Sequence, residues 1–288
     1  MSTEAATWDG LARARANPNF HPAIELEARL ARDVFHALPA GHRWLLADRG
    51  RFNMGLLALL LAASDAFTAQ ALGQACKARE IGSVGRALKY VEHLLRYGLV
   101  QAEPGEGRWT THRLTLGPIL IGHYRTRFRA TLEALSLFDP STAPALDLID
   151  TDEFLPLCLT LAGANGDRSD LARTVYARGM GIFMERDCGM LILMDLMLGQ
   201  AQGRGRLLEG ARLSRYGLAR DYGVSRAHIN KLLADAGAAG LLTLEADGSA
   251  VAFSPHLSEV LELHNAAIFH GLRAGIAQYL ASRPAARD

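Results

Sequence analysis

One short segment of this 288-residue chain carries basic side chains at a spacing suited to contacting phosphates and base edges. It follows Ser83 and contains Arg86, Lys89 and His93. Arg and Lys bind phosphate oxygens and the O6/N7 edge of guanine, so the chemistry predicted here is recognition rather than catalysis. The apolar residues of the segment share one helical face and should pack inward, namely Ala87, Val91 and Leu94.

A second segment repeats this pattern after Ser225, with Arg226, His228, Asn230 and Lys231. An Asn amide can make two hydrogen bonds to adenine, which adds a base-reading group to the basic ones. Ser83 and Ser225 are each suited to cap a helix, because a serine hydroxyl can accept a bond from a free amide of the first turn. The inward face of this helix is predicted to consist of Ile229, Leu233 and Ala236.

The two segments stand at equivalent places in a longer repeat. Each is followed, 15 residues after its Ser, by a Gly-Leu pair, at Gly98 and at Gly240. The sequence of residues 30–35 also returns, with changes, as residues 171–176. Offsets of 141 and 142 residues at two distant places predict a tandem duplication of almost the whole chain.

The elements that must position these segments follow from apolar periodicity, caps and Gly/Pro breaks. Helices are predicted at 23–38, 44–48, 52–63, 68–76 with Thr68 as cap, 83–97 and 119–137. Strands at 99–103 and 109–116 form a hairpin, and residues 139–147 form a linker. The second half has predicted helices at 171–180, 190–198, 215–222 with Ser214 as cap, 225–239 and 257–282, a loop at 199–205, and strands at 241–245 and 250–254.

This order of elements resembles the winged helix-turn-helix transcription regulators. Residues 223–242 resemble the GntR type, and residues 83–100 are more similar to the MarR type. The resemblance implies a mainly α fold with small β-hairpin wings, in which two winged helices are joined by a helical core as a pseudo-dimer. The halves would span 1–140 and 147–288, with winged helices at about 52–118 and 190–255.

In these families the helix after the Ser enters the DNA major groove, and the wing touches the backbone or the minor groove. The resemblance therefore implies further contacts from Arg108, His112 and Arg113 on the first wing. The caps Thr68 and Ser214, with the adjacent Arg215, complete the predicted DNA-binding set. The second wing departs from the pattern, because it carries the acidic residues Glu245 and Asp247.

The net charge of +1 hides a strongly uneven distribution. Residues 79–129 hold nine Arg and Lys against four Glu, and residues 204–231 hold seven against two acids, so each stretch carries +5. Residues 232–269 have five acids and no Lys or Arg. Positive charge gathers around the two predicted recognition helices, as a phosphate-binding surface requires.

Other classes of function find little support in the residues. Phosphate-loop and HExxH motifs are absent, so we expect neither an enzyme nor a metal or cofactor. The apolar runs are shorter than the roughly 20 residues that span a bilayer. Three widely spaced cysteines and an N-terminus without a secretory pattern lead us to expect a cytoplasmic protein that does not bind membranes.

The leading hypothesis is a sequence-specific, double-stranded DNA-binding transcription regulator that acts as an intramolecular pseudo-dimer or pairs further as a homodimer. The alternatives are a plasmid-type tandem winged-helix replication initiator and a winged-helix protein-interaction scaffold, which the acidic second wing favours. The resemblance also allows a small-molecule effector in a crevice between core and wings. The candidate lining residues are Trp44, Phe52, Met54, Phe183 and Met184.

Overall fold

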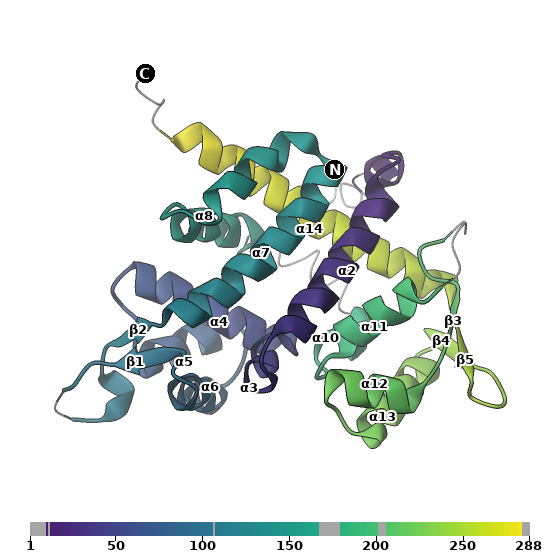
Figure 1. Ribbon diagram of the computed structural model, residues 1–288, viewed down its shortest axis with the longest axis horizontal. Helices are drawn as coiled ribbons and strands as arrows, with labels where there is room; N and C mark the ends of the chain where they lie inside the picture. The colour runs from purple at the N-terminus through teal and green to yellow at the C-terminus, as the bar shows by residue number, and fades with distance from the viewer. Residues whose placement is uncertain (1–9, 11, 106, 167–178, 201–205, 284–288) are drawn as a thin grey trace.

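The computed structural model describes residues 10, 12–105, 107–166, 179–200 and 206–283. The described chain is mainly helical, with two small antiparallel sheets (Figure 1). The first half comprises α2 (Phe20–Ala37), α3 (Ala40–Arg43), η1 (Trp44–Leu46), α4 (Arg49–Ala63), α5 (Ala69–Ala78), α6 (Val84–Arg96), β1 (Val100–Ala102), η2 (Trp109–Thr111), β2 (Leu114–Leu116) and α7 (Pro118–Phe138). The 3₁₀ segment η3 (Pro140–Leu148) follows.

The second half presents a similar order of elements. It comprises α8 (Phe154–Gly166), α10 (Gly181–Met184), α11 (Gly189–Leu198), β3 (Gly210–Arg212), α12 (Arg215–Tyr222), α13 (Arg226–Ala238), β4 (Leu242–Leu244), β5 (Ala250–Phe253) and α14 (Pro255–Ser282). We name α4–α6 with β1 and β2 the first unit, and α11–α13 with β3–β5 the second unit. The predicted helix 171–180 and loop 199–205 fall largely outside the described residues.

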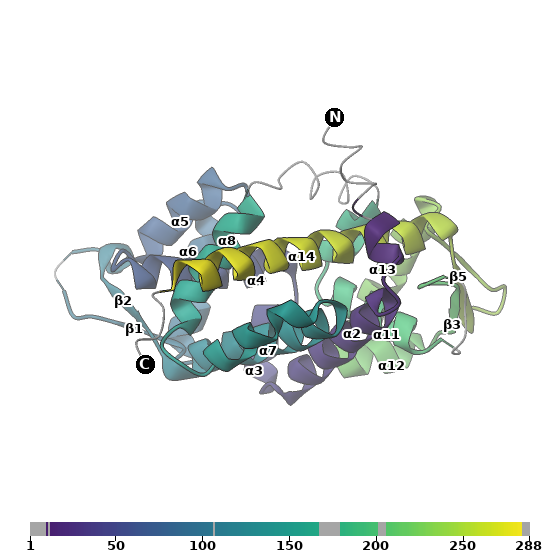
Figure 2. The ribbon, with the colours of Figure 1, turned by 90° about the horizontal axis from the view of Figure 1, so that it is seen from above.

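The long helices of the two halves exchange partners in a reciprocal way. Helix α2 packs on α7 of its own half and on α11 of the second unit. Helix α8 packs on α14 of its own half and on α4 of the first unit. Each unit is thus held by a helix from the other half, and the two hairpins lie at opposite ends of the molecule (Figure 2).

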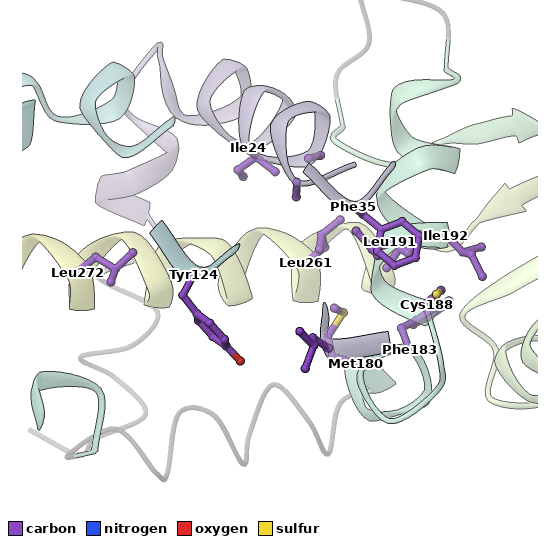
Figure 3. Close-up of a cluster of buried hydrophobic side chains, with 14 of the residues drawn as sticks. Ile24, Phe35, Tyr124, Met180, Phe183, Cys188, Leu191, Ile192, Leu261 and Leu272 are labelled. Atoms are coloured by element: carbon purple, nitrogen blue, oxygen red, sulfur yellow. The ribbon is translucent and has the colours of Figure 1, made fainter. Parts of the chain in front are cut away.

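A single apolar core runs through this arrangement. Figure 3 shows Ile24 and Phe35 of α2 gathered with Leu191 of α11 and Leu261 of α14, all buried. Phe35 also lies against Tyr222 of α12, with ring centroids 5.7 Å apart. The Cys188 amide donates to the Ala47 carbonyl across the halves at 2.6 Å. The second unit is therefore docked against α2 by apolar packing and by the backbone.

The two sheets differ by one strand. In the first unit β1 pairs antiparallel with β2, Val100 opposite Leu116. In the second unit the order is β3-β5-β4, with Gly210 opposite Ala252. Strand β3 is not among the strands predicted from the sequence. In the first unit the Leu114 amide of β2 donates a hydrogen bond to the carbonyl of Phe67, just before α5, at 2.8 Å. This single bond is at the position equivalent to the pairing of β3 with β5 in the second unit.

Several predicted boundaries are wrong, each for a local reason. Residues 109–111 form the 3₁₀ turn η2 rather than a strand, because the Thr111 amide and hydroxyl both bond to the Arg108 carbonyl. The predicted linker 139–147 is the 3₁₀ segment η3, whose Thr142 and Ala145 are buried. Its start is fixed by Asp139, which accepts the Ser141 amide.

The turn between the last two helices of each unit has the same left-handed geometry. Glu80 has φ +56° and Gly223 has φ +67°. After these residues the Ile81 amide donates to the Cys76 carbonyl, and the Val224 amide donates to the Ala219 carbonyl. Only glycine adopts this conformation without steric cost. The first unit therefore carries a strained glutamate where the second has a glycine.

Glu80→Gly is accordingly expected to stabilise the fold by about 0.5–1 kcal/mol, because it removes the left-handed strain of a side chain. Gly223→Ala is expected to destabilise it by about 1 kcal/mol, although nothing lies within 4 Å of the added Cβ, since the strain comes from φ alone. Urea midpoints measure both changes. A shift of the same sign for the two substitutions would contradict the conformational explanation.

Helix α14 also carries a half-buried histidine that resists protonation. His264 of α14 lies near Glu27 and Arg49, and burial lowers its pKa to about 4, with Arg49 acting in the same direction and Glu27 against it. The unfolded chain, with a histidine pKa of about 6.5, therefore binds more protons between pH 6.5 and 4. Stability is full above that window and is lost as the pH falls through it.

From pH 7 to pH 5 we expect His264 to remove about 2 kcal/mol of the free energy of unfolding. The measurement is guanidinium chloride unfolding at both pH values, for the natural chain and for His264→Gln, which keeps a polar side chain of similar size without a titrating ring. The variant should lose less stability than the natural chain over the same interval. Equal losses would show that His264 does not carry this pH dependence.

Candidate nucleic-acid interface

Helix α6 presents its polar face outward as predicted. The Ser83 hydroxyl accepts the Arg86 amide at 3.2 Å and caps the helix. The predicted inward residues are all buried, namely Ala87, Val91 and Leu94. Gly98, with φ +65°, ends the helix and turns the chain into β1. Lys89, Glu92 and Arg96 are exposed along the outer face.

Helix α13 has the same construction in the second unit. The Ser225 hydroxyl accepts the His228 amide at 3.0 Å, and Gly240, with φ +68°, follows the helix. The predicted inward residues Ile229, Leu233 and Ala236 are all buried, and Leu232 is buried with them. The outer face exposes three polar side chains with two alanines beside them: Arg226, Asn230, Lys231, Ala227 and Ala234.

The outer faces hold side chains that remain available for a ligand. Within the part of the chain that the structure describes, Lys89, Arg226 and Asn230 have no hydrogen-bond or ion-pair partner. The Lys231 ammonium lies 3.3 Å from Asp235, and its side chain is 65% exposed. Such an exposed pair contributes little, so Lys231 can exchange it for a phosphate.

Two predicted contact residues of α6 are engaged elsewhere, which corrects the expectation that both are free. A guanidinium nitrogen of Arg86 lies 3.1 and 3.2 Å from the carboxylate oxygens of Asp48. The His93 ring stacks on Trp44, with centroids 3.9 Å apart, and its Nε2 donates to the Gly41 carbonyl at 3.1 Å. Burial lowers the pKa of His93, against the raising effect of the Gly41 bond, so His93 packs the helix as a neutral ring.

His228 of α13, also predicted as a DNA contact, is likewise engaged within the chain. Its Nε2 donates to the Asp187 backbone carbonyl at 2.9 Å. Arg86 and His228 both occupy the third position after the capping serine, so equivalent residues of the two helices turn toward the region between the units. The sequence pattern marks these positions as solvent-facing, because their partners come from distant segments.

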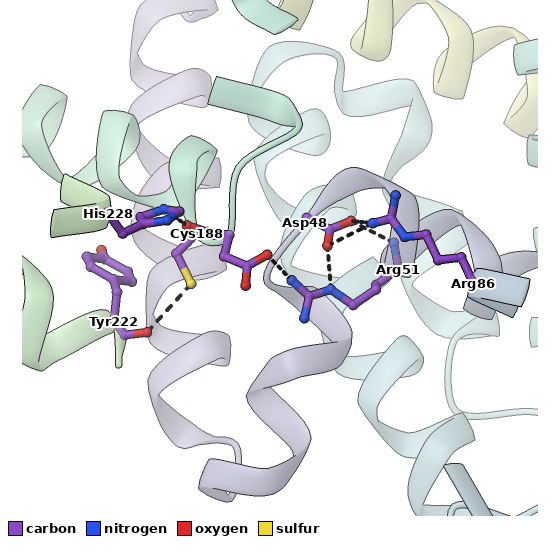
Figure 4. Close-up of polar contacts among 7 residues, drawn as sticks. Asp48, Arg51, Arg86, Cys188, Tyr222 and His228 are labelled. Carbon is purple, nitrogen blue, oxygen red and sulfur yellow. Dashed lines mark hydrogen bonds and ion pairs between the residues drawn. The ribbon is translucent and has the colours of Figure 1, made fainter. Parts of the chain in front are cut away.

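These two side chains end on one polar network between the units (Figure 4). Asp48 caps α4, accepting the Arg51 amide at 2.8 Å, and also receives the Arg51 guanidinium. Arg51 bonds in turn to the Asp187 carboxylate, just before α11. The chain of contacts therefore runs from Arg86 through Asp48, Arg51 and Asp187 to His228.

The capping roles of Thr68 and Ser214 are confirmed. The Thr68 hydroxyl accepts the Ala71 amide at 3.0 Å at the start of α5, and the Ser214 hydroxyl accepts the Gly217 amide at 3.1 Å at the start of α12. Each hydroxyl is thereby occupied by its own helix. Whether these helix ends meet a phosphate stays a prediction.

The three predicted contact residues of the first hairpin differ in their exposure and partners. Arg108 is exposed, with no ion pair among the described residues. Arg113 instead pairs with Asp65 and lies 3.6 Å from Glu103. The partly buried His112 ring lies against Gly105, and its Nε2 has no partner in the described chain.

The second hairpin places Arg215 against its own turn. The Arg215 guanidinium lies within 3.0 Å of the point where a Cβ on Gly248 would stand. Glu245 and Asp247 are exposed near that turn, and the Ser249 amide lowers the pKa of Asp247 by bonding to its carboxylate. Arg215 thus places positive charge beside the acidic turn.

Two features of this surface are not predicted from the sequence. The first is Tyr216, which is 65% exposed in the first turn of α12. The second is the Asp48–Arg51 pair. A signal for it exists, because Asp48-Arg49-Gly50 recurs as Asp187-Cys188-Gly189 near the repeat offset.

Several residues considered for an effector crevice are packed against other side chains. Met54 and Phe183 are buried in the core, and Trp44 stacks on Tyr90 with centroids 5.3 Å apart. A cavity of about 490 Å³ lies elsewhere, between α2 and α14, and is lined by Arg15, Asn17, Pro18, Phe20, His21, Arg206 and Glu262. The Glu262 carboxylate is already paired with Arg15 and His21.

Two further findings concern the part of the chain that the structure describes. Among the described residues, no helix has the length and apolar character to cross a bilayer. In that same part of the chain, no three His, Cys, Asp or Glu side chains converge on a point that could hold a metal. Comparison of the chain with known protein families, with curated proteins and with solved structures gives no match.

Proposed function

We propose that the first and second units are winged helix-turn-helix modules and that the chain is a sequence-specific, double-stranded DNA-binding transcription regulator. The observation that carries the proposal is the pair of serine-capped helices, α6 and α13, each with a buried apolar face and an exposed face of unpaired basic or amide groups. Figure 1 shows both helices at the lower edge, with a hairpin beyond each. Two recognition helices with outer wings would have a comparable layout, which supports the proposal.

The two recognition helices differ in what they can read. Arg226 and Asn230 stand one turn apart on α13, where the neighbouring alanines leave room for close approach to base edges. Arg and Asn are suited to guanine and adenine respectively. On α6 the engagement of Arg86 leaves Lys89 and Arg96, which suit phosphates. We therefore propose an asymmetric site, in which the second half-site carries most of the sequence information.

The test is selection of bound duplexes from random DNA, followed by affinity measurements over a range of salt. An asymmetric consensus and a linear fall of log affinity with log salt are expected. Lys89→Ala should reduce the magnitude of the salt slope by about 1 without changing the consensus. No binding to any duplex, or a perfectly symmetric consensus, would reject the proposal in the form given.

A protein-interaction scaffold is the second candidate, favoured by the exposed acids Glu245 and Asp247 on the second hairpin. A wing that touches the DNA backbone should not carry uncompensated acids, because like charges repel. In the proposed regulator Arg215 offsets them, or the second unit binds through α13 alone. Glu245→Lys separates the candidates: a regulator should bind DNA more tightly, whereas a scaffold should show no change in DNA affinity.

A further inference from the structure

The polar network between the units is built from equivalent pieces of the two halves. Asp48 and Asp187 occupy matching Asp-x-Gly sequences that open α4 and α11. Each meets the third residue of a recognition-helix candidate: Asp48 through its carboxylate to Arg86, and Asp187 through its carbonyl to His228. The two aspartates therefore hold equivalent points of α6 and α13.

One side chain connects the Asp48–Arg86 contact with the Asp187–His228 contact. Arg51 bonds to both Asp48 and Asp187, and so crosses from the first half to the second. The matching residue of the second half is Met190, which cannot make this bond. Arg51 therefore makes a contact across the boundary between the halves that its counterpart in the second half cannot make.

The bridge formed by Asp48, Arg51 and Asp187 is buried at its Asp48 end and exposed to solvent at its Asp187 end. The Arg51 and Asp48 side chains are only 7% and 4% exposed, whereas the Asp187 side chain is 55% exposed. The Arg51 guanidinium also lies over the Trp44 ring, 4.8 Å from its centroid. A buried charge with several partners has few alternative positions, so Arg51 offers a fixed anchor point to Asp187.

We propose that Asp48, Arg51 and Asp187 are positioning residues that fix the separation and orientation of α6 and α13. Where the chain binds DNA, as in the proposed function on which this part rests, the same bridge sets the spacer length tolerated between the two half-sites. The Cys188 amide donates to the Ala47 carbonyl, and this bond joins the backbones next to Asp187 and Asp48. Half-site spacing is a geometric property of two linked recognition helices, so loss of the link should relax it.

Asp187→Ala is the primary variant, because its exposed side chain can be removed without leaving a cavity. Asp187→Asn keeps an acceptor for Arg51 without the charge and should give an intermediate effect. The matched control is Asp221→Ala, another exposed acid, whose partner is its neighbour Arg220. Arg51→Met introduces the residue type found at the matching position, Met190, and should change the separation of the two helices most. Thermal unfolding checks that this variant is folded.

The first readout needs no DNA. Spin labels are attached at Glu92→Cys on α6 and Ala234→Cys on α13, both exposed positions, while the native cysteines are buried and have raised pKa values that make them slow to react. The distance distribution between the labels should be narrow in the parent and clearly broader in Asp187→Ala. It should stay narrow in Asp221→Ala. An unchanged distribution in both Asp187→Ala and Arg51→Met overturns the proposal.

The second readout is spacer discrimination on the selected duplex. The parent should bind the selected spacer better than spacers one base pair longer or shorter, and Asp187→Ala should reduce that preference about 3- to 10-fold, the range for one lost hydrogen bond of ordinary strength. Broadening of the distances without DNA binding by the parent would support the positioning role and reject the proposed function. DNA binding with spacer preference unchanged in Asp187→Ala would reject the spacing role alone.

Discussion

We expect the triple variant Arg226→Ala, Asn230→Ala, Lys231→Ala to bind its selected duplex at least about 100-fold more weakly than the parent chain. A bidentate contact from Asn230 is worth about 1–3 kcal/mol of discrimination, and two lost cations remove two phosphate or guanine contacts. All three side chains are exposed and the helix keeps its buried face, so the fold should persist. Fluorescence anisotropy at fixed salt measures the change.

The single substitutions separate base reading from charge. Asn230→Ala should relax the preference at one base pair and leave the salt slope unchanged, whereas Lys231→Ala should weaken all duplexes alike and lower the slope by about 1. Arg129→Ala and Arg273→Ala provide controls, because these exposed arginines lie on α7 and α14, away from both recognition-helix candidates. Retention of parental affinity by the triple variant would exclude α13 as a reading element.

Phe35→Ala is expected to cost about 3–5 kcal/mol of the free energy of unfolding, the usual range for a large buried aromatic ring. The ring is 1% exposed, 5.7 Å from the Tyr222 ring, with the Arg43 guanidinium over it at 5.8 Å. Because α2 and the second unit pack on each other here, the cavity weakens the joint between the halves as well as the core (Figure 3).

Denaturant unfolding followed by far-UV circular dichroism measures the loss. A lower m-value or a second transition would show that the second unit unfolds separately once the joint is weakened. Ile119→Ala is the control, because that side chain is 50% exposed at the start of α7 and should cost well below 1 kcal/mol. Equal costs for the two substitutions would show that Phe35 is not an important part of the joint.

Local signals accounted for the helices that carry the candidate site. Ser83 and Ser225 are caps as predicted, and three of the four buried residues of each helix are those expected. Tyr90 of α6 and Leu232 of α13 are also buried. Both features depend on neighbours within about four residues, so periodicity and capping chemistry suffice. The same locality explains the failures at 109–111 and 139–147, where side-chain bonds from Thr111 and Asp139 produced 3₁₀ turns.

The charge distribution along the chain indicated where a polyanion could bind, but not which basic residues are available. Lys89 and Arg226 remain unpaired on the surface, whereas Arg113 is paired with Asp65, 48 residues away. Helical periodicity places a side chain on a face. It cannot show whether another segment of the chain brings an acid to that face.

The sequence by itself determined the repeated order of elements, the caps and the outward faces, because each depends on short-range spacing along one helix or turn. Only the tertiary structure decided that Arg86 and His228 point into a shared network. Their partners, Asp48 and Asp187, are 38 and 41 residues away, and Arg51 reaches Asp187 across 136 residues. Contacts over such separations depend on how α2 and α8 pack the halves together, which no local pattern encodes.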